Sequence, residues 1–359
     1  MKRIVIACDG TWNRADMDQP SNVLRLARAV APHGADGIEQ VVCHLDGVGS
    51  GRGTGWLART IDKTLGGAMG FGLMENIAEA YRFLVFNHAP GDQIFLFGYS
   101  RGAFTARSLV GLIRNCGLLR RDAIDELPEA LALYRSRGDE GHPNGTLARE
   151  FRARNAVGGE EGWPELSYLG IWDTVGSLGI PKHLWWAARA NRGLAFHDTA
   201  LTSKVRAARH AVAIDERRRT FQPALWDNLA ALNAERPCLP YRQLWFPGTH
   251  GSIGGGTPEP LSNEALHWVA EGAIAEGLVL DPEARALWAE ARDCRAAIPS
   301  EHGLLAQFVA LGHRDRNGPA DVAEIANAGR QRWSLLPDWR PGTLKAVADE
   351  LDMPPGFWI

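Results

Sequence analysis

The stretch Gln93-Ile-Phe-Leu-Phe-Gly98-Tyr-Ser100-Arg-Gly102-Ala-Phe-Thr-Ala-Arg107 decides the fold of this chain. It places a Gly-x-Ser-x-Gly motif directly after a short apolar run and directly before an amphipathic helical pattern. A nucleophilic serine needs this context, because a sharp strand-to-helix turn lifts the hydroxyl above a sheet and only small residues at Gly98 and Gly102 avoid a clash. The alternative is a glycine-flanked turn with an inert serine. We predict that Ser100 is a catalytic nucleophile.

Outward from this motif, short apolar runs rich in Val, Ile and Leu alternate with helical patterns. This alternation is typical of an α/β fold with a mainly parallel sheet of about six or more strands flanked by helices. The expected strands are Arg3–Cys8, Val41–Asp46, Gln93–Gly98, Leu166–Trp172, His210–Ile214 and Arg242–Phe246. The expected helices include Val23–Ala31 (with Ser21 and Asn22 as candidate caps), Met74–Asn87 and Ala103–Ile113.

Two segments interrupt the alternation and suggest helical insertions above the sheet, at about residues 117–160 and 182–200. We expect residues 1–280 to form one catalytic domain that contains both insertions. The pattern over residues 281–359 is irregular and partly helical. We expect it to form a C-terminal extension packed on the same domain.

Composition excludes several classes of protein. The chain has 359 residues, and 39 Lys and Arg against 42 Asp and Glu give a net charge of −3, which offers no reason to expect nucleic acid as a partner. No run approaches 18 apolar residues, so we expect no transmembrane segment and at most peripheral membrane contact. The apolar run Ile4–Cys8 is too short for a signal peptide. The oligomeric state is not indicated.

The cysteines indicate a reducing compartment. All five are widely spaced and none forms a Cys-x-x-Cys pair, which argues against a disulfide framework and a zinc site. We expect no metal, no cofactor and a cytoplasmic location in the producing cell.

An acid and a base should follow the serine along the chain, since a serine hydroxyl needs a histidine oriented by a carboxylate. His250 ends the last predicted strand in a glycine-rich loop. Asp173 ends an earlier strand before a turn of small residues, a position where catalytic groups collect in parallel sheets. Asp215 also ends a strand and is the alternative acid. Because Glu216 and three arginines follow Asp215, which favours a salt-bridge network there, we prefer Asp173.

The oxyanion of an acyl-transfer intermediate requires backbone donors beside the serine. The Arg101 amide follows the nucleophile directly, and Gly10 or Thr11, after the first strand, offers a second amide. Asp9 either contacts substrate or braces this loop.

Two further features suggest substrate contacts. The glycine-rich segment 46–55 lacks the GK[ST] ending of a P-loop, and we interpret it as a loop bordering the site. We expect Arg52, within this loop, to contact a substrate phosphate. Trp185 and Trp186 suggest an apolar lid for lipid; packing in the core is the alternative.

Several of these motifs together resemble the DUF2235 family of α/β-hydrolases. The matching segments are CDGTWN at 8–13, GYSRGAFTAR at 98–107, IWDTVG at 171–176, AIDERRRTF at 213–221 and WFPGTHGSIGGG at 245–256. The family includes the Tle1-group phospholipase effectors of type VI secretion. The resemblance implies an α/β-hydrolase core, Ser100 as nucleophile, His250 as base and Asp173 as acid. Type VI cargo carries no cleavable signal peptide, so the sequence leaves export by such a system open. One departure is Ser252, because the family commonly has an acidic residue two positions after the histidine.

These observations predict a serine esterase that cleaves carboxylic esters, with lipid or phospholipid acyl esters as the preferred subset. Two alternatives remain at this point. One is a catalytically silent α/β-hydrolase domain used for binding or in a secretion apparatus. The other is a peptidase or thioesterase that uses the same three residues.

Overall fold

The computed structural model describes residues 1–11, 13, 15–16, 18–47, 66–136, 142–175, 200–236, 238–255, 259–299 and 312–353. The expectations for Arg52, for Trp185 and Trp186, and for nearly all of the 182–200 insertion lie outside these residues.

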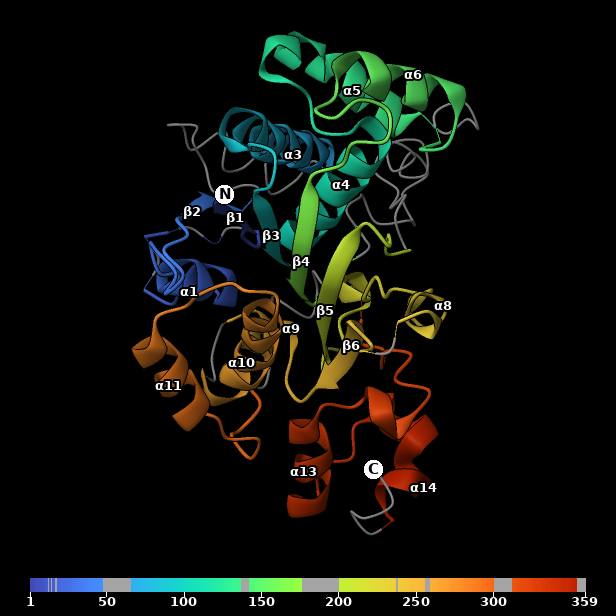
Figure 1. The fold of residues 1–359 in the computed structure, drawn as a ribbon. Coiled ribbons are helices and arrows are strands. Elements are labelled where there is room, and N and C mark those ends of the chain that lie inside the picture. Colours follow the sequence, from blue (N-terminus) through green and yellow to red (C-terminus); the bar gives the residue numbers. More distant parts are fainter. Residues whose placement is uncertain are drawn as a thin grey trace.

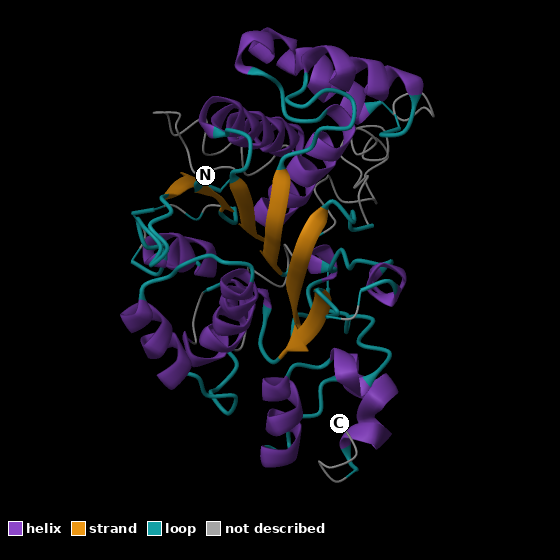
Figure 2. Cartoon of the chain, viewed as in Figure 1, coloured by secondary structure: helices purple, strands orange, loops and turns teal. Residues whose placement is uncertain are grey.

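A single six-stranded parallel sheet forms the centre of the described structure, in the order β2-β1-β3-β4-β5-β6 (Figure 2). The strands are β1 (Arg3–Cys8), β2 (Gln40–Leu45), β3 (Gln93–Tyr99), β4 (Glu165–Trp172), β5 (Val205–Ala213) and β6 (Tyr241–Phe246). The predicted α/β class and parallel sheet are confirmed. Strand β5 begins five residues earlier than expected. The prediction missed its start because Arg206 and Arg209 interrupt the apolar pattern; in the structure Arg206 pairs with Glu165, and Arg209 lies over the Trp268 ring.

The strand order changes direction at β1, which has β2 on one side and β3 on the other. Ligand sites of open parallel sheets form at the carboxyl ends of the strands beside such a switch point. The register pairs Cys8 with Gly98 and Gly98 with Ile171, so the chain leaves β1, β3 and β4 at adjacent points. The segments after these strands therefore meet at one edge of the sheet.

Helices cover both faces of the sheet (Figure 1). One face carries α3 (Gly66–Asn87) and α4 (Arg101–Cys116), and the other carries α1 (Asn22–Ala29), α9 (His250–Gly254), α10 (Glu259–Ala275) and α11 (Pro282–Glu290). Successive side chains of β1 point to opposite faces of the sheet. Ile4 and Ile6 pack in the core on the α3 and α4 face, while Val5 and Ala7 pack in the core on the other face. Ser21 caps α1, as expected, by accepting a hydrogen bond from the Leu24 amide (3.1 Å).

Residues 117–160 contain η1 (Arg121–Glu126), α5 (Leu127–Arg135) and α6 (Thr146–Asn155). Helix α4 begins at the carboxyl edge of the sheet and runs back along it, so this segment starts at the amino edge. Figure 1 shows α5 and α6 beyond the far end of α4. The segment therefore lies at the opposite edge of the sheet from Ser100.

The C-terminal residues 312–353 pack against the end of the sheet formed by β5 and β6 (Figure 1). They contain η4 (Val322–Glu324), α13 (Asn327–Leu335), η5 (Gly342–Val347) and α14 (Ala348–Leu351), while η3 (Arg219–Phe221) and α8 (Leu229–Ala234) lie between β5 and β6. The apolar side chains of residues 312–353 form a third buried cluster with Val212, Ile214 and Trp245. Among the described helices, none is both long enough and apolar enough to cross a bilayer.

Candidate active site

Ser100 lies at the junction of β3 and α4, with no loop between the strand and the helix. Its backbone has φ 56° and ψ −118°, a conformation that non-glycine residues rarely adopt. A Cβ atom at Gly98 would lie 2.4 Å from the Gly102 carbonyl oxygen, and one at Gly102 would lie 2.1 Å from the Cys8 carbonyl oxygen. Both glycines are therefore required by backbone contacts on either side of the serine.

Three residues from separate elements form a continuous row of hydrogen bonds. His250 Nε2 lies 2.9 Å from Ser100 Oγ, and His250 Nδ1 lies 2.5 Å from Asp173 Oδ2. Because an ionised carboxylate only accepts, Nδ1 carries the proton and Nε2 is left to accept from the serine hydroxyl. All three side chains are buried, and Asp173 is 0% exposed. The structure thus brings together the predicted nucleophile, base and acid.

Asp173 has four donors around its carboxylate. Besides His250, the Ala213 amide donates to Oδ1 (2.9 Å), and Arg316 donates from Nη1 to Oδ1 (2.6 Å) and from Nη2 to Oδ2 (2.8 Å). Burial alone would raise the pKa of Asp173, but the charge and hydrogen bonds of Arg316, together with His250, hold this pKa well below its usual range. The carboxylate is therefore ionised while fully buried.

The alternative acid, Asp215, binds different partners. Its Oδ2 accepts from the Gly248 amide (2.7 Å) and its Oδ1 from Trp339 Nε1 (2.9 Å). Asp215 thus links the chain just before His250 to the C-terminal segment, whereas the ring of His250 bonds to Asp173.

The His250 ring contacts two aromatic rings, and the His250 backbone contacts a further acid. Tyr99 and Phe221 place their ring centroids 4.9 and 4.8 Å from the centroid of the imidazole. The His250 amide donates to Glu216 Oε2 (3.2 Å). At the departure from the family pattern, Ser252 is buried with its Oγ 3.2 Å from Thr249 Oγ1. In this chain a carboxylate from Glu216 therefore contacts the histidine segment.

The candidate oxyanion donors come from the start of α4 and from the segment after β1. Arg101 is the first residue of α4, and burial lowers the pKa of its side chain to about 10. A Cβ atom at Gly10 would lie 2.6 Å from the Tyr99 ring, so Gly10 lies against the residue that precedes Ser100. The Gly10 amide, however, donates to Asp9 Oδ1 (2.7 Å).

Asp9 acts as a brace in the segment after β1. Its Oδ2 accepts from Ser21 Oγ (2.8 Å) and lies 3.2 Å from His44 Nε2, while its Oδ1 accepts from the Gly10 amide. The Asp9 side chain is 0% exposed, and both of its oxygens contact protein groups. The contacts of Asp9 thus join the segment after β1 to Ser21 and His44.

Sequence reasoning missed the residues that support the row of hydrogen bonds, namely Arg316, Glu216, Phe221 and Tyr99. Tyr99 and Glu216 lie next to predicted site residues, and that adjacency was the available signal. Arg316 lies 143 residues from Asp173 in a region without clear periodicity, and no local pattern points to it.

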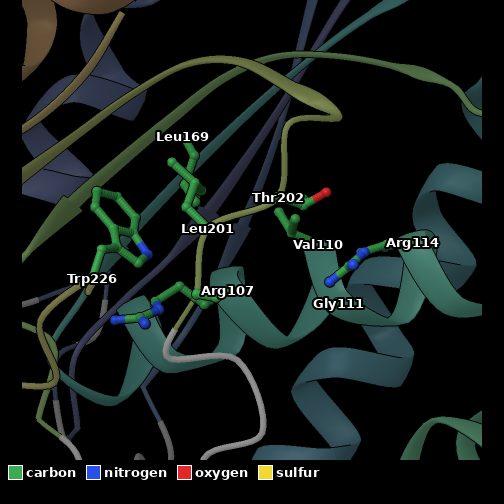
Figure 3. Close-up of a pocket in the computed structure, with 9 residues that line it drawn as sticks. Arg107, Val110, Gly111, Arg114, Leu169, Leu201, Thr202 and Trp226 are labelled. Carbon is green, nitrogen blue, oxygen red and sulfur yellow. The ribbon is translucent and has the colours of Figure 1, made fainter. Parts of the chain in front are cut away.

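A separate cavity lies along α4, from the second turn of the helix onward. It is lined by Arg107, Val110, Gly111, Arg114, Leu169, Ala200, Leu201, Thr202 and Trp226 (Figure 3). The guanidinium of Arg107 lies over the Trp226 ring and donates to the Ala224 carbonyl. Across the described ranges, no group of three or more His, Cys, Asp or Glu side chains is arranged to hold a metal ion.

Comparison with known proteins gives one family match and one curated relative. Residues 2–272 match the family described as "T6SS, Phospholipase effector Tle1-like, catalytic domain". The uncharacterized protein YEL023C of Saccharomyces cerevisiae is 30% identical over 236 residues, which is 62% of this chain and 32% of the relative. The chain thus spans about a third of that curated relative.

Solved structures show weaker likeness. An uncharacterized protein from Pseudomonas aeruginosa has a TM-score of 0.42 at 19% identity, covering 79% of this chain and 47% of that one. The Tle1 effector bound to the VgrG spike of the type VI secretion system has 0.40 at 21%, covering 73% and 52%. The peroxisomal α/β-hydrolase Lpx1 of Saccharomyces cerevisiae has 0.32 at 12%, covering 80% and 82%.

Proposed function

Because this chain belongs to the family of type VI secretion Tle1-like phospholipase effector catalytic domains, we propose that it is a serine hydrolase that cleaves carboxylic esters. The observation that carries the proposal is the row of hydrogen bonds from Ser100 through His250 to Asp173. A domain used only for binding has no need of a buried base aligned on a serine hydroxyl.

In the proposed first half-reaction, Ser100 Oγ bonds to the ester carbonyl carbon while its proton moves to His250 Nε2. Asp173 stabilises the imidazolium through Nδ1. His250 then gives the proton to the leaving oxygen as the carbon–oxygen bond breaks, which releases the alcohol and leaves acyl-Ser100. In the second half, His250 takes a proton from water, the hydroxide adds to the acyl carbon, and the proton returns to Ser100 as the acid departs.

We assign one oxyanion contact to the Arg101 amide, at the positive end of α4. Of the two candidates for the second contact, Gly10 already donates its amide to Asp9, which favours Thr11.

Lipid or phospholipid acyl esters are the proposed substrates. The family description, which names a phospholipase effector, supports this choice. Thioesters and amides are the competing substrates, since the same three residues serve their hydrolysis.

A fluorophosphonate probe tests the activated serine. We expect covalent labelling at Ser100, mapped by peptide mass, that is lost in Ser100→Ala and His250→Ala. Ser108→Ala is the matched control, because Ser108 is a buried serine on the same helix and outside the hydrogen-bonded row. Absence of labelling in the wild-type protein, under conditions where a control esterase reacts, would favour the silent binding domain.

Substrate class is tested separately by acid release from matched oxyester, thioester and amide substrates and from phospholipid vesicles. We expect oxyester and phospholipid turnover in the wild-type protein and none in Ser100→Ala. Faster thioester or amide turnover would reassign the activity.

The family description also supports a proposal about delivery: synthesis in the cytoplasm followed by export through a type VI apparatus. Its test is the appearance of the protein in the culture medium of a producing strain, compared with a strain lacking a functional apparatus. Equal amounts outside both strains would contradict this route.

A further inference from the structure

Arg316 is a fully buried arginine paired with the acid of the proposed catalytic row. Its side chain is 0% exposed, and two parallel hydrogen bonds of 2.6 and 2.8 Å join its guanidinium to both oxygens of Asp173. Arginine matches a carboxylate in this way because its planar fork presents two donors at the right spacing. Arg316 also lies beyond residues 2–272, the part of the chain that matches the family.

The surroundings hold the guanidinium from the other side. Nη1 also donates to the Ala213 carbonyl at the end of β5 (2.9 Å), and Nη2 donates to the Phe221 carbonyl in η3. Phe221 in turn packs its ring against His250. The position of Arg316 is therefore tied to two elements that border the active site.

We propose that Arg316 is a positioning residue, which fixes the plane of the Asp173 carboxylate so that Oδ2 faces His250 Nδ1. The C-terminal segment thereby contributes to the active site. This inference rests on the proposed serine hydrolase function.

The physical need for such a residue follows from burial. A carboxylate removed from water becomes costly to ionise unless a charge compensates it. Without Arg316, the donors that the described residues leave around the Asp173 oxygens are the Ala213 amide and His250. The carboxyl group would then gain rotational freedom and a tendency to hold a proton. A protonated acid no longer stabilises the imidazolium.

Other ionisable groups face Asp173 and must be considered with Arg316. They are His250, the Tyr99 hydroxyl and His210. Burial lowers the pKa of His210 to about 3, and its Nε2 accepts from the Thr174 amide, so it stays neutral near pH 7. Burial raises the pKa of Tyr99, so it is neutral as well. Arg316 is then the cation that compensates Asp173 while His250 is unprotonated.

The test compares Arg316→Gln with Arg314→Gln, a matched control two residues earlier with an exposed side chain. For Arg316→Gln we expect kcat to fall by about 10- to 100-fold, since small misplacements of catalytic groups have effects of this size. We also expect the acidic limb of the pH–rate profile to move to higher pH, because Asp173 takes up a proton more readily. Arg314→Gln should match the wild type within about twofold. A fall in the kcat of Arg316→Gln that is equal at every pH, with the acidic limb of the pH–rate profile unmoved, would overturn the proposal.

Conservative replacement and chemical rescue distinguish a loss of positioning from a folding defect in the Arg316 variants. Arg316→Lys keeps the charge but lacks the fork, so we expect an intermediate rate. Added guanidinium ion should restore part of the activity of Arg316→Ala and have no such effect on Arg314→Ala. Failure of guanidinium to restore activity to a folded Arg316→Ala protein would count against positioning.

A readout independent of turnover separates this inference from the proposed function. The Nδ1 proton shared between His250 and Asp173 should give a low-field proton NMR signal in the wild type. We expect this signal to be lost or shifted in Arg316→Gln and retained in Arg314→Gln. If the signal shows this dependence but the probe does not label Ser100, the hydrolase proposal alone is contradicted. If the signal is unchanged in Arg316→Gln, the positioning role of Arg316 is contradicted.

Discussion

Asp173 combines complete burial with full charge. Its backbone also has φ +40°, outside the range that non-glycine residues prefer. Such a residue persists only because Arg316, His250 and the Ala213 amide surround the carboxylate. Removal of the charge should therefore affect both stability and turnover.

For Asp173→Asn we expect kcat to fall by about 10³- to 10⁴-fold, as neutral amides do in this role. The variant leaves Arg316 buried beside a neutral group, so it should also lose about 3–5 kcal/mol of stability. Kinetics at low temperature and denaturant unfolding measure the two effects. Asp215→Asn is the control and should keep kcat within about threefold; the reverse pattern would identify Asp215 as the acid.

The pH dependence of stability provides a further prediction for Asp215. Burial raises the pKa of Asp215 from 3.8 to about 6, although the hydrogen bonds from Gly248 and Trp339 act to lower this pKa. Between these values the folded state holds a proton that the unfolded chain releases, so the contribution of Asp215 to stability declines as the pH rises toward 6. Asp215→Asn does not titrate. We expect its free energy of unfolding, relative to wild type, to increase from pH 5 to pH 7.

Urea unfolding of both proteins at the two pH values measures this difference. A relative stability that stays constant or decreases with pH would contradict the raised pKa.

At the scale of elements, the junction of β3 and α4 places Ser100, the proposed nucleophile. The strand ends and the helix begins around one residue, so the direction of Ser100 depends on how closely α4 approaches β1. Gly102 permits that approach because it lies against the Cys8 and Asp9 carbonyls. The same contact fixes the start of α4 at the switch point of the sheet.

We therefore expect Gly98→Ala and Gly102→Ala each to destabilise the fold, by about 1–3 kcal/mol for overpacking against backbone, and to reduce labelling of Ser100. Gly251→Ala in α9 is the control, because a Cβ atom there would meet only Thr249 Oγ1 at 4.0 Å. Thermal unfolding and the labelling rate report the two effects. Full labelling of Ser100 in both Gly98→Ala and Gly102→Ala would show that the junction tolerates side chains.

At the scale of the whole molecule, residues 312–353 combine two roles. They cover the β5 and β6 end of the sheet with an apolar cluster, and they supply Arg316 and Trp339 to the acids Asp173 and Asp215. We propose that the C-terminal extension and the catalytic domain unfold as one unit.

Leu344 tests this coupling, since it is fully buried in that cluster. We expect Leu344→Ala to cost about 2–5 kcal/mol and to shift thermal unfolding and loss of activity together to a lower temperature. Leu335→Ala is the control, because Leu335 is 57% exposed. Two separate transitions in Leu344→Ala, with activity retained after the first, would show that the segment is independent of the site.

Much of the fold could be predicted because its signals are local. Each strand is an apolar run of a few residues, and the serine junction is specified by Gly98 and Gly102 within one turn. The boundaries of β5 were less predictable, since the charged residues Arg206 and Arg209 interrupt the apolar pattern of this strand. The position of the 117–160 segment at the amino edge depends on the length and direction of α4.

The sequence by itself determined the parallel α/β class, the turn at Ser100 and the presence of acids and a histidine at strand ends. Only the tertiary structure decided that Asp173 and not Asp215 meets the His250 ring, and that Arg316 compensates it. The reason is physical. Periodicity and glycine requirements act over a few neighbouring residues, whereas the contacts of Asp173 join residues 77 and 143 positions apart. Such contacts depend on how strands pack side by side and on where the C-terminal segment returns to the sheet.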